Sequence, residues 1–367
     1  MSSKDISLAM TTLRDSPTTL MFHAEMIPPI SDSVGDAVQQ SLPPLDPRGE
    51  LASYSTFLKS RPPAFETYAV EEIVSLADLA PKLHLHIVHL SALECIPILR
   101  EARARGINIT AETCFHYLAL ASDNIEDGDT RHKCCPPIRS LTNQDRLWAE
   151  LAADDSCIRT VVSDHSPCTP ELKLLPLHLQ TAASHESDSD SDDGRGPRTF
   201  MRHSDSGVDV SMGHENEKQM MSQAENAGDF FAAWGGISSV GLGLPILHTA
   251  ATERIVHGDE KVPSLLDMVR LCSQATAHQV GLSHRKGGLR VGLDADVCVF
   301  DDEDVWTLRA GNMRWKNKCS PWEGHTFHGR VHETWVRGRK IFQLGGANGG
   351  FIGGKPVGRP IVERRTE

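Results

Sequence analysis

The stretch LHLHIVHLSALECIPILREARARGINITAETC, residues 83–114, decides the fold class. Its two ends, 83–91 and 107–114, are short apolar and β-branched runs that are typical of buried strands. The residues between them have the apolar spacing of a helix, and Gly106 marks its end. A helix that joins two strands predicts a parallel pair. We therefore expect an α/β protein.

The same alternation continues on both sides of this unit. Helices are predicted over 5–14, 65–80 and 144–155, and further strands over 18–23 and 158–164. Four strands that alternate with helices are typical of a parallel sheet or a barrel. In such folds the functional side chains gather at the carboxyl ends of the strands.

The chain changes character after residue 180. Residues 184–226 open with a run of Ser, Asp and Gly without apolar periodicity, which favours a disordered acidic insertion and leaves phosphorylation of its serines as an alternative. A helix is predicted over 263–281, with a proline near its start and a glycine at its end. We assign 5–285 to a partial barrel that contains the insertion, 286–345 to a small β-unit and 346–367 to a tail.

Composition narrows the functional classes. A net charge of −12 and a pI near 5.8 leave no basic stripe for a phosphate backbone, so we expect no nucleic-acid partner. Nine cysteines without a CxxC pair indicate reduced thiols and a cytoplasmic location. No run of 18 apolar residues occurs, so we expect a soluble protein without a membrane partner. A small-molecule or protein partner is favoured.

Five polar residues at predicted strand ends form the candidate site: His23, His86, His89, Asp164 and His165. Imidazoles and a carboxylate on rigid elements suit a divalent ion such as zinc. Each residue alone also fits a structural role, since a histidine at a strand end can be a hydrogen-bonded core residue and Asp164 can cap a turn. Strand alternation places His86 and His89 on opposite faces, so at most one should point into a barrel.

The glycine-rich segment GGISSVGLGLP, residues 235–245, fits neither the dinucleotide-binding nor the P-loop spacing. It is either a flexible turn or a source of backbone groups for a polar, planar ligand. A serine hydrolase is excluded because no GxSxG motif occurs. A cysteine nucleophile at Cys114 or Cys134 has no supporting spacing.

Together these segments resemble the amidohydrolase superfamily and, within it, the cyclic amidases of the allantoinase family. The blocks that carry the resemblance are MFHAEM (21–26), HIVHLS (86–91), AETCFHYL (111–118), KCCPPIR (133–139), VVSDHSPCTPELK (161–173), WGGISSVGLGLPILHT (234–249) and GLRVGLDADVCVFD (288–301). The resemblance implies a (β/α)8 TIM barrel of the metal-dependent hydrolase type with two metal ions, usually zinc, and a small β-sandwich. It also implies a homo-oligomer.

The resemblance implies specific roles as well. His23 and His89 correspond to the metal ligands on the fifth and sixth strands, and Asp164 to the eighth-strand carboxylate that is also the general base. The implied substrate contacts are Cys114, Gly236, Ile237 and Ser238. The implied reaction is hydrolysis of the hydantoin-ring amide of allantoin to allantoate, in purine catabolism.

One departure from the family pattern concerns the metal ligands. The family has an HxH pair on its first strand and a carboxylated lysine on its fourth, but neither occurs in the 22 residues before His23. His84 and His86 form HLH in the sixth-strand segment, so we interpret that match as coincidental. We therefore expect a barrel whose first strands are missing, with three of six metal-coordinating groups, fewer than two zinc ions or none, and weak or no activity.

Two alternatives remain open. One is a dihydropyrimidinase-like or dihydroorotase-like cyclic amidase. The other is a non-catalytic protein with the amidohydrolase fold that acts by association, with the acidic insertion as its interaction element.

Overall fold

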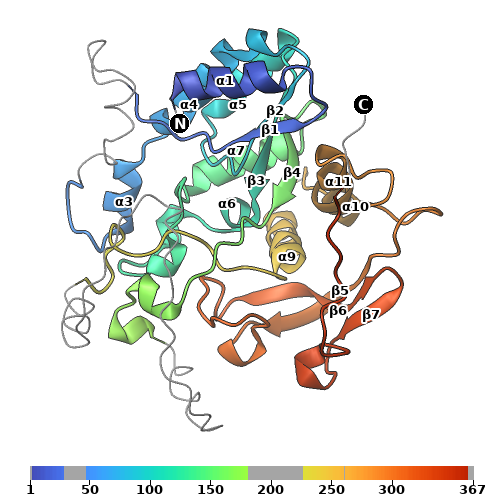
Figure 1. Ribbon diagram of the computed structural model, residues 1–367. Helices are drawn as coiled ribbons and strands as arrows, with labels where there is room; N and C mark the ends of the chain where they lie inside the picture. The colour runs from blue at the N-terminus through green and yellow to red at the C-terminus, as the bar shows by residue number, and fades with distance from the viewer. Residues whose placement is uncertain (1, 29–46, 181–225, 260, 363–367) are drawn as a thin grey trace, which may run out of the picture.

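The computed structural model describes residues 2–28, 47–180, 226–259 and 261–362. Two sheets organise them: a four-stranded sheet in the order β1-β2-β3-β4 and a three-stranded sheet in the order β5-β6-β7 (Figure 1). The predicted acidic insertion at 184–226 lies outside the described residues, except for Asn226.

The four-stranded sheet is parallel throughout. Its strands are β1 (Thr19–Phe22), β2 (His84–Ile87), β3 (Ile109–Cys114) and β4 (Ile158–Val162). Met21 pairs with His86, and His86 pairs with Thr110, so the strands lie side by side in chain order. All four strands lie within the predicted ranges, and the predicted parallel arrangement is confirmed.

The helices α1 (Ser3–Leu13), α4 (Ala64–Ser75), α5 (Cys95–Ala104) and α7 (Leu141–Leu151) pack on one face of this sheet, because their apolar residues and those of the strands are buried in one core. α6 (Phe115–Ala119) directly follows β3, and the rings of Tyr54 and Phe57 on α3 (Tyr54–Ser60) contact the ring of Phe230. Met10 of α1, Val70 of α4 and Leu99 of α5 share one apolar core with Leu85 and Ile87 of β2. Burial of each such side chain stabilises the fold by about 1.5–3 kcal/mol.

The opposite face of the sheet is polar. The side chains of His84 and His86 on β2 lie beside Thr110 on β3, and Thr160 on β4 bonds to Glu112 on β3. These residues alternate with the apolar ones because successive strand side chains point to opposite faces.

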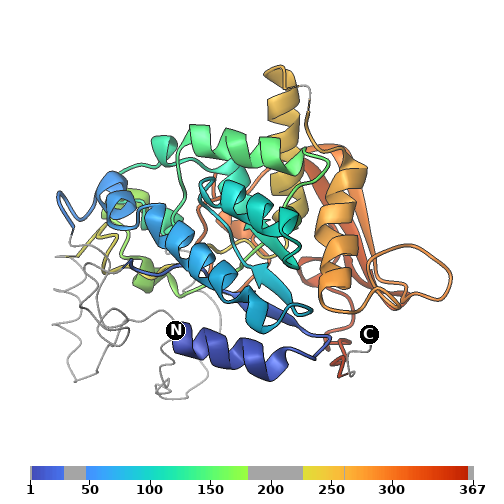
Figure 2. The same ribbon diagram turned by 90° about the horizontal axis from the view of Figure 1, so that it is seen from above.

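The rest of the described chain forms a helical layer and a second sheet. The helix α9 (Gly243–Val256) contacts both α6 and β6, and lies between the two sheets (Figures 1 and 2). The predicted 263–281 helix is present as α10 (Leu265–Val269), a π-helical turn over Arg270–Gln274 and α11 (Ala275–Gln279). A capping box at Ser264 begins this run, and Gly281, with φ of 74°, follows its end.

The second sheet is antiparallel and lies within the range predicted for a small β-unit. Its strands are β5 (Val297–Thr307), β6 (Thr326–Val336) and β7 (Arg339–Gln343). The described short 3-10 helices are Ala77–Leu79, Ser122–Asn124, Thr130–His132, Pro170–Lys173, Leu177–Leu179, Ala310–Asn312 and Asn348–Gly350. No described helix is both long enough and apolar enough to cross a membrane.

Candidate active site

The carboxyl ends of β1–β4 meet at one edge of the parallel sheet. His23 directly follows β1, His89 lies two residues after β2, and Asp164 lies two residues after β4. Because the strands are parallel neighbours, these residues from distant parts of the sequence reach the same edge.

The two predicted histidine ligands are in ring contact. The ring centroids of His23 and His89 are 4.6 Å apart, with an interplanar angle of 76°. His89 and Asp164 both have left-handed backbones, with φ of 40° and 43°. Such conformations are uncommon for residues other than glycine, and strained backbone of this kind clusters at functional sites.

The surroundings of His89 keep its imidazole neutral. Burial lowers the pKa of His89, the nearby His23 lowers it further, and the Asp164 carboxylate opposes both effects. A neutral imidazole is the form that binds a metal ion. The Asp164 charge acts on His89 because the structure brings the two side chains to the same region.

Glu25 is a buried neighbour of His23. Its carboxylate is buried, accepts a 2.8 Å hydrogen bond from Arg61 and lies 3.5 Å from Nε2 of His23. Burial acts to raise the pKa of Glu25, but the hydrogen bond from His23 and the charge of Arg61 outweigh it, and the pKa lies below its ordinary value. An ionised Glu25 is placed to orient His23, as a supporting residue does at a metal ligand.

Residues of the neighbouring strand surround the side chain of His86 and bond to it. Its side chain is fully buried, its Nδ1 lies 2.7 Å from Oγ1 of Thr110, and its Nε2 lies 3.2 Å from Oε2 of Glu112. Nε2 of His84 lies 2.7 Å from the same threonine hydroxyl. Both ring nitrogens of His86 therefore have partners, and the HLH pair forms part of the polar sheet face. Alternation does not extend to His89, because β2 ends at Ile87.

The loop that contains Gly236, Ile237 and Ser238 lies beside the segment that follows β4. Ile237 forms a parallel bridge with His165, and the Ser166 amide donates to the Ile237 carbonyl at 3.0 Å. Nδ1 of His165 accepts hydrogen bonds from the amides of Ser239 at 2.9 Å and Val240 at 3.0 Å. Burial lowers the pKa of His165, which keeps this acceptor unprotonated. His165 thus fastens the loop.

Gly236 is required by its geometry. Its φ is 152°, and a Cβ at this position would lie 2.5 Å from the carbonyl oxygen of Ser166. The Gly236 amide also donates to the carbonyl of Lys133 at 2.8 Å, which joins the loop to the KCCPPIR segment. A side chain at this position would force these two segments apart.

Several buried polar atoms near the strand ends have no hydrogen-bond partner among the described residues. They are Oε1 of Glu25, Nδ1 of His89, both ring nitrogens of His116, and the hydroxyls of Ser238 and Ser239. An unsatisfied buried polar group costs about 1–3 kcal/mol. Such a concentration indicates that a polar ligand or water belongs here.

His116 is the residue that sequence reasoning missed. It lies two residues after β3, the same offset that His89 has from β2 and Asp164 has from β4. Its side chain is fully buried, and burial lowers its pKa to about 3. The histidine in AETCFHYL, just beyond a predicted strand, was the available signal.

Cys114, the last residue of β3, is fully buried in the apolar core. Burial raises the pKa of its thiol well above the ordinary value, so the sulfur stays protonated and is a poor nucleophile. Its predicted contact with substrate stays a prediction.

The donor atoms at this site suit zinc but do not complete a site by themselves. Within 2–28, 47–180, 226–259 and 261–362, no three His, Cys, Asp or Glu side chains are grouped closely enough to hold a metal ion. His23 and His89 provide two imidazoles, whereas a structural or catalytic zinc ion takes at least three protein ligands.

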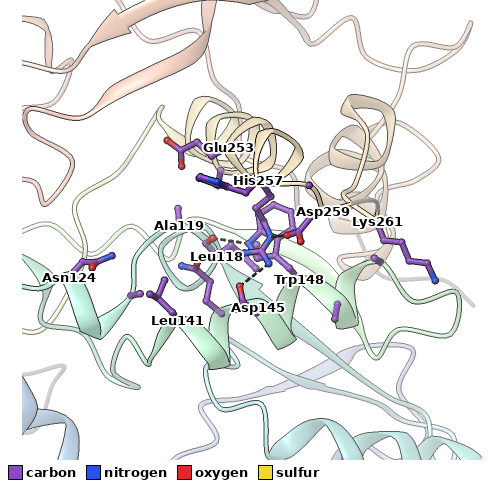
Figure 3. A pocket seen from close by; sticks show the side chains of 17 residues that line it. Leu118, Ala119, Asn124, Leu141, Asp145, Trp148, Glu253, His257, Asp259 and Lys261 are labelled. Carbon is purple, nitrogen blue, oxygen red and sulfur yellow. Dashed lines mark hydrogen bonds and ion pairs between the residues drawn. The ribbon is translucent and has the colours of Figure 1, made fainter.

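A cavity of about 1080 Å³ lies between α7 and α9, and none of the candidate residues line it (Figure 3). Arg254 dominates it, with 2.8 Å ion pairs to Asp145 and Asp259 and its guanidinium over the ring of Trp148. Its charge is therefore compensated within the protein.

Comparison with known proteins shows which proteins this chain is similar to. A model of the amidohydrolase family matches residues 243–342. The chain is 36% identical to the allantoinase of Saccharomyces cerevisiae over 362 residues, which cover 98% of this chain and 62% of that protein. It is 30% identical to the probable allantoinase 2 of Dictyostelium discoideum, which covers 93% of this chain and 55% of that protein. The chain spans less than two thirds of either relative.

Solved structures show the fold. The L-hydantoinase (dihydropyrimidinase) of Arthrobacter aurescens matches with a TM-score of 0.66 and 20% identity, over 94% of this chain and 62% of that one. The D-hydantoinase of Bacillus sp. AR9 matches with a TM-score of 0.64 and 22% identity, over 96% and 62%. The parallel sheet with its helices is thus a portion of a TIM barrel, followed by a small β-unit.

Proposed function

Because this chain belongs to the amidohydrolase superfamily, we propose that the protein hydrolyses one amide bond of the hydantoin ring of allantoin, giving allantoate, as a step in purine catabolism. Similarity to allantoinases along nearly the whole chain supports this substrate. The observation that carries the proposal is the meeting of His23, His89 and Asp164 at one sheet edge, with the glycine loop beside them.

Asp164 is the proposed general base. In this role its exposed carboxylate accepts a proton from the attacking water and delivers it to the ring nitrogen that leaves. The backbone of Asp164 is left-handed, with φ of 43°, a conformation that clusters at functional sites. Cys114 and the loop residues Gly236, Ile237 and Ser238 are the proposed substrate contacts.

His23, His89 and Asp164 are the proposed metal-binding residues, and zinc is the proposed metal. When bound, the metal lowers the pKa of a water molecule and polarises the scissile carbonyl. Glu25 holds His23 through its hydrogen bond, and burial keeps His89 neutral. Because these residues provide only part of a two-metal site, we expect the chain to bind fewer than two zinc ions and to turn over allantoin weakly or not at all.

We further propose a cytoplasmic location and a homo-oligomer. All nine cysteines are free, which agrees with a reducing compartment.

The experiment combines metal analysis with a ligand panel. The purified chain is loaded with zinc, its bound metal is counted by mass spectrometry, and its affinities for allantoin, dihydrouracil and dihydroorotate are measured by calorimetry. We expect less than two equivalents of zinc and preferential binding of allantoin. Asp164→Asn is expected to remove any residual allantoate formation, whereas His257→Ala, which changes an exposed histidine at the cavity between α7 and α9, should change neither zinc content nor ligand affinity.

Tighter binding of dihydrouracil or dihydroorotate than of allantoin would indicate that the substrate is another cyclic amide. Failure to bind any of the three ligands would instead favour the non-catalytic alternative. Two tightly bound zinc ions with rapid turnover would contradict the expectation of an incomplete site.

A further inference from the structure

Lys173, at the end of VVSDHSPCTPELK, is a buried lysine whose described hydrogen-bond partners are three main-chain carbonyls. Its side chain is 3% exposed. Its Nζ donates to the carbonyls of Gly236 at 2.7 Å, Trp234 at 3.0 Å and Thr130 at 3.3 Å. An ammonium has three N–H donors, so this arrangement uses all of them. A buried charge is tolerated only where hydrogen bonds replace water.

These bonds connect three segments that are far apart in the sequence. Thr130 precedes the KCCPPIR segment, Lys173 is the last residue of the segment that contains Asp164, and Trp234 and Gly236 belong to the glycine loop. The link between the first two is doubled, because the Thr130 hydroxyl donates to the carbonyl of Lys173. The loop is also held by the hydrogen bond from the Trp234 amide to the Leu172 carbonyl at 2.8 Å.

Lys173 and its neighbours occupy the carbonyl groups of the loop. Besides the two carbonyls bound by Lys173, that of Ile237 accepts from the Ser166 amide and that of Ser238 accepts from the Ser320 hydroxyl at 2.5 Å. The hydroxyls of Ser238 and Ser239 are buried but have no described partner. Because the amides of Trp234, Gly236 and Ser239 are bonded as well, the hydroxyls of Ser238 and Ser239 are the loop groups that the structure leaves to donate to a ligand.

We propose that Lys173 is a positioning residue that engages the carbonyls of the 234–239 loop on the protein side, so that the loop binds the carbonyl oxygens of a cyclic ureide through the hydroxyl donors of Ser238 and Ser239. This inference rests on the proposed function, because it concerns the same ligand. The inference predicts that the loop prefers rings rich in hydrogen-bond acceptors. The sequence alone did not indicate whether the loop offers donors or acceptors to its ligand. A hydantoin ring has two such carbonyl oxygens.

The test is the variant Lys173→Met, which removes the ammonium group but keeps an unbranched side chain of similar length. In Lys173→Met, hydrogen exchange of the amides of residues 235–240 is expected to become at least tenfold faster, because an opening free energy lower by about 1.4 kcal/mol corresponds to a factor of ten. Calorimetry with hydantoin is expected to show at least tenfold weaker binding. Amides of β5 and β6 should keep their exchange rates, which separates a local effect from general destabilisation.

A matched control is Arg103→Met. Arg103 also donates to a main-chain carbonyl, that of Ile109 at 3.1 Å, but it lies on α5 and has no described contact with the loop. This variant should leave both loop exchange and hydantoin binding unchanged. If Lys173→Met does not fold, Thr130→Val removes the hydroxyl bond to the Lys173 segment and is expected to accelerate loop exchange to a smaller extent.

A ligand pair tests the donor preference. The unaltered chain should bind hydantoin more tightly than 2-imidazolidinone, which lacks one ring carbonyl, and Lys173→Met should lose most of this preference. Equal loop exchange and equal hydantoin affinity in the two proteins would overturn the role of Lys173. If the unaltered chain binds no cyclic ureide, the proposed function fails, and the inferred ligand preference fails with it. Loop exchange would then still decide whether Lys173 anchors the loop.

Discussion

Breaking the buried Glu66–Arg139 ion pair should destabilise the protein strongly. Glu66, on α4, is 2% exposed, and its Oε1 accepts a 2.7 Å hydrogen bond from Arg139 at the end of KCCPPIR. Its Oε2 accepts from the amides of Ser91 at 2.9 Å and Ala92 at 3.0 Å. Glu66 therefore connects this segment to the turn that follows His89.

The magnitude follows from burial. Removing one partner of a buried ion pair costs about 3–5 kcal/mol, because the remaining charge loses both water and its partner. Glu66→Ala and Arg139→Ala should each fall in this range, and Glu66→Ala also leaves two amides without an acceptor. The double variant should lose less than the sum of the single losses, since it leaves no isolated charge.

The assay is urea denaturation at pH 7 followed by tryptophan fluorescence, as a double-mutant cycle. Domains are stable by only about 5–15 kcal/mol, so Glu66→Gln is a milder companion that retains an acceptor for the Ser91 and Ala92 amides. The control is Asp155→Ala, which breaks a 3.2 Å pair with Arg100 in which Asp155 is 76% exposed and which should cost at most about 1 kcal/mol. Single losses below about 1 kcal/mol, or strictly additive losses, would refute this account of the pair.

Three further predictions concern the candidate site. Gly236→Ala should destabilise the chain by about 1–3 kcal/mol or more from backbone strain, and it should weaken hydantoin binding. The control is Gly241→Ala, which should leave binding unchanged, because Gly241 has a φ of 80° but open space around its Cβ position. Urea denaturation measures stability in both variants, and calorimetry measures binding. Because the folded-state pKa of His116 is lowered to about 3, its contribution to stability is fully present above pH 6.5 and is lost as the pH falls toward 3, by up to about 1.4 kcal/mol per pH unit. His116→Phe should reduce this slope when urea midpoints at pH 7, 5 and 4 are compared, and equal slopes in the two proteins would contradict the assignment. His89→Ala should remove zinc from the chain. His86→Gln should retain zinc but lose about 1–3 kcal/mol of stability, because the ring nitrogens of His86 are bonded to Thr110 and Glu112. Loss of zinc in both variants would show that His86 also supports the metal.

The alternation of apolar runs was sufficient to predict the four parallel strands and the helices α4, α5 and α7 between them, but not the short helices α3 and α6. This information is local: a strand and a helix differ in the spacing of their apolar residues, and each spacing can be recognised within ten to fifteen residues. The same logic selected His23, His89 and Asp164, because the end of a predicted strand is also a local feature. The resemblance of the sequence blocks then supplied the family.

The sequence by itself thus determined the order of the elements and the edge of the sheet at which polar residues collect. Only the tertiary structure decided which of those residues are already satisfied. Both His86 and His116 stand at or just beyond a strand, but His86 has partners for both ring nitrogens and His116 has none among the described residues. Lys173 likewise gives no signal as a loop anchor, because its acceptors lie more than forty residues away in either direction. The physical reason is that hydrogen-bond partners and burial depend on contacts across the fold, whereas periodicity depends only on neighbours along the chain.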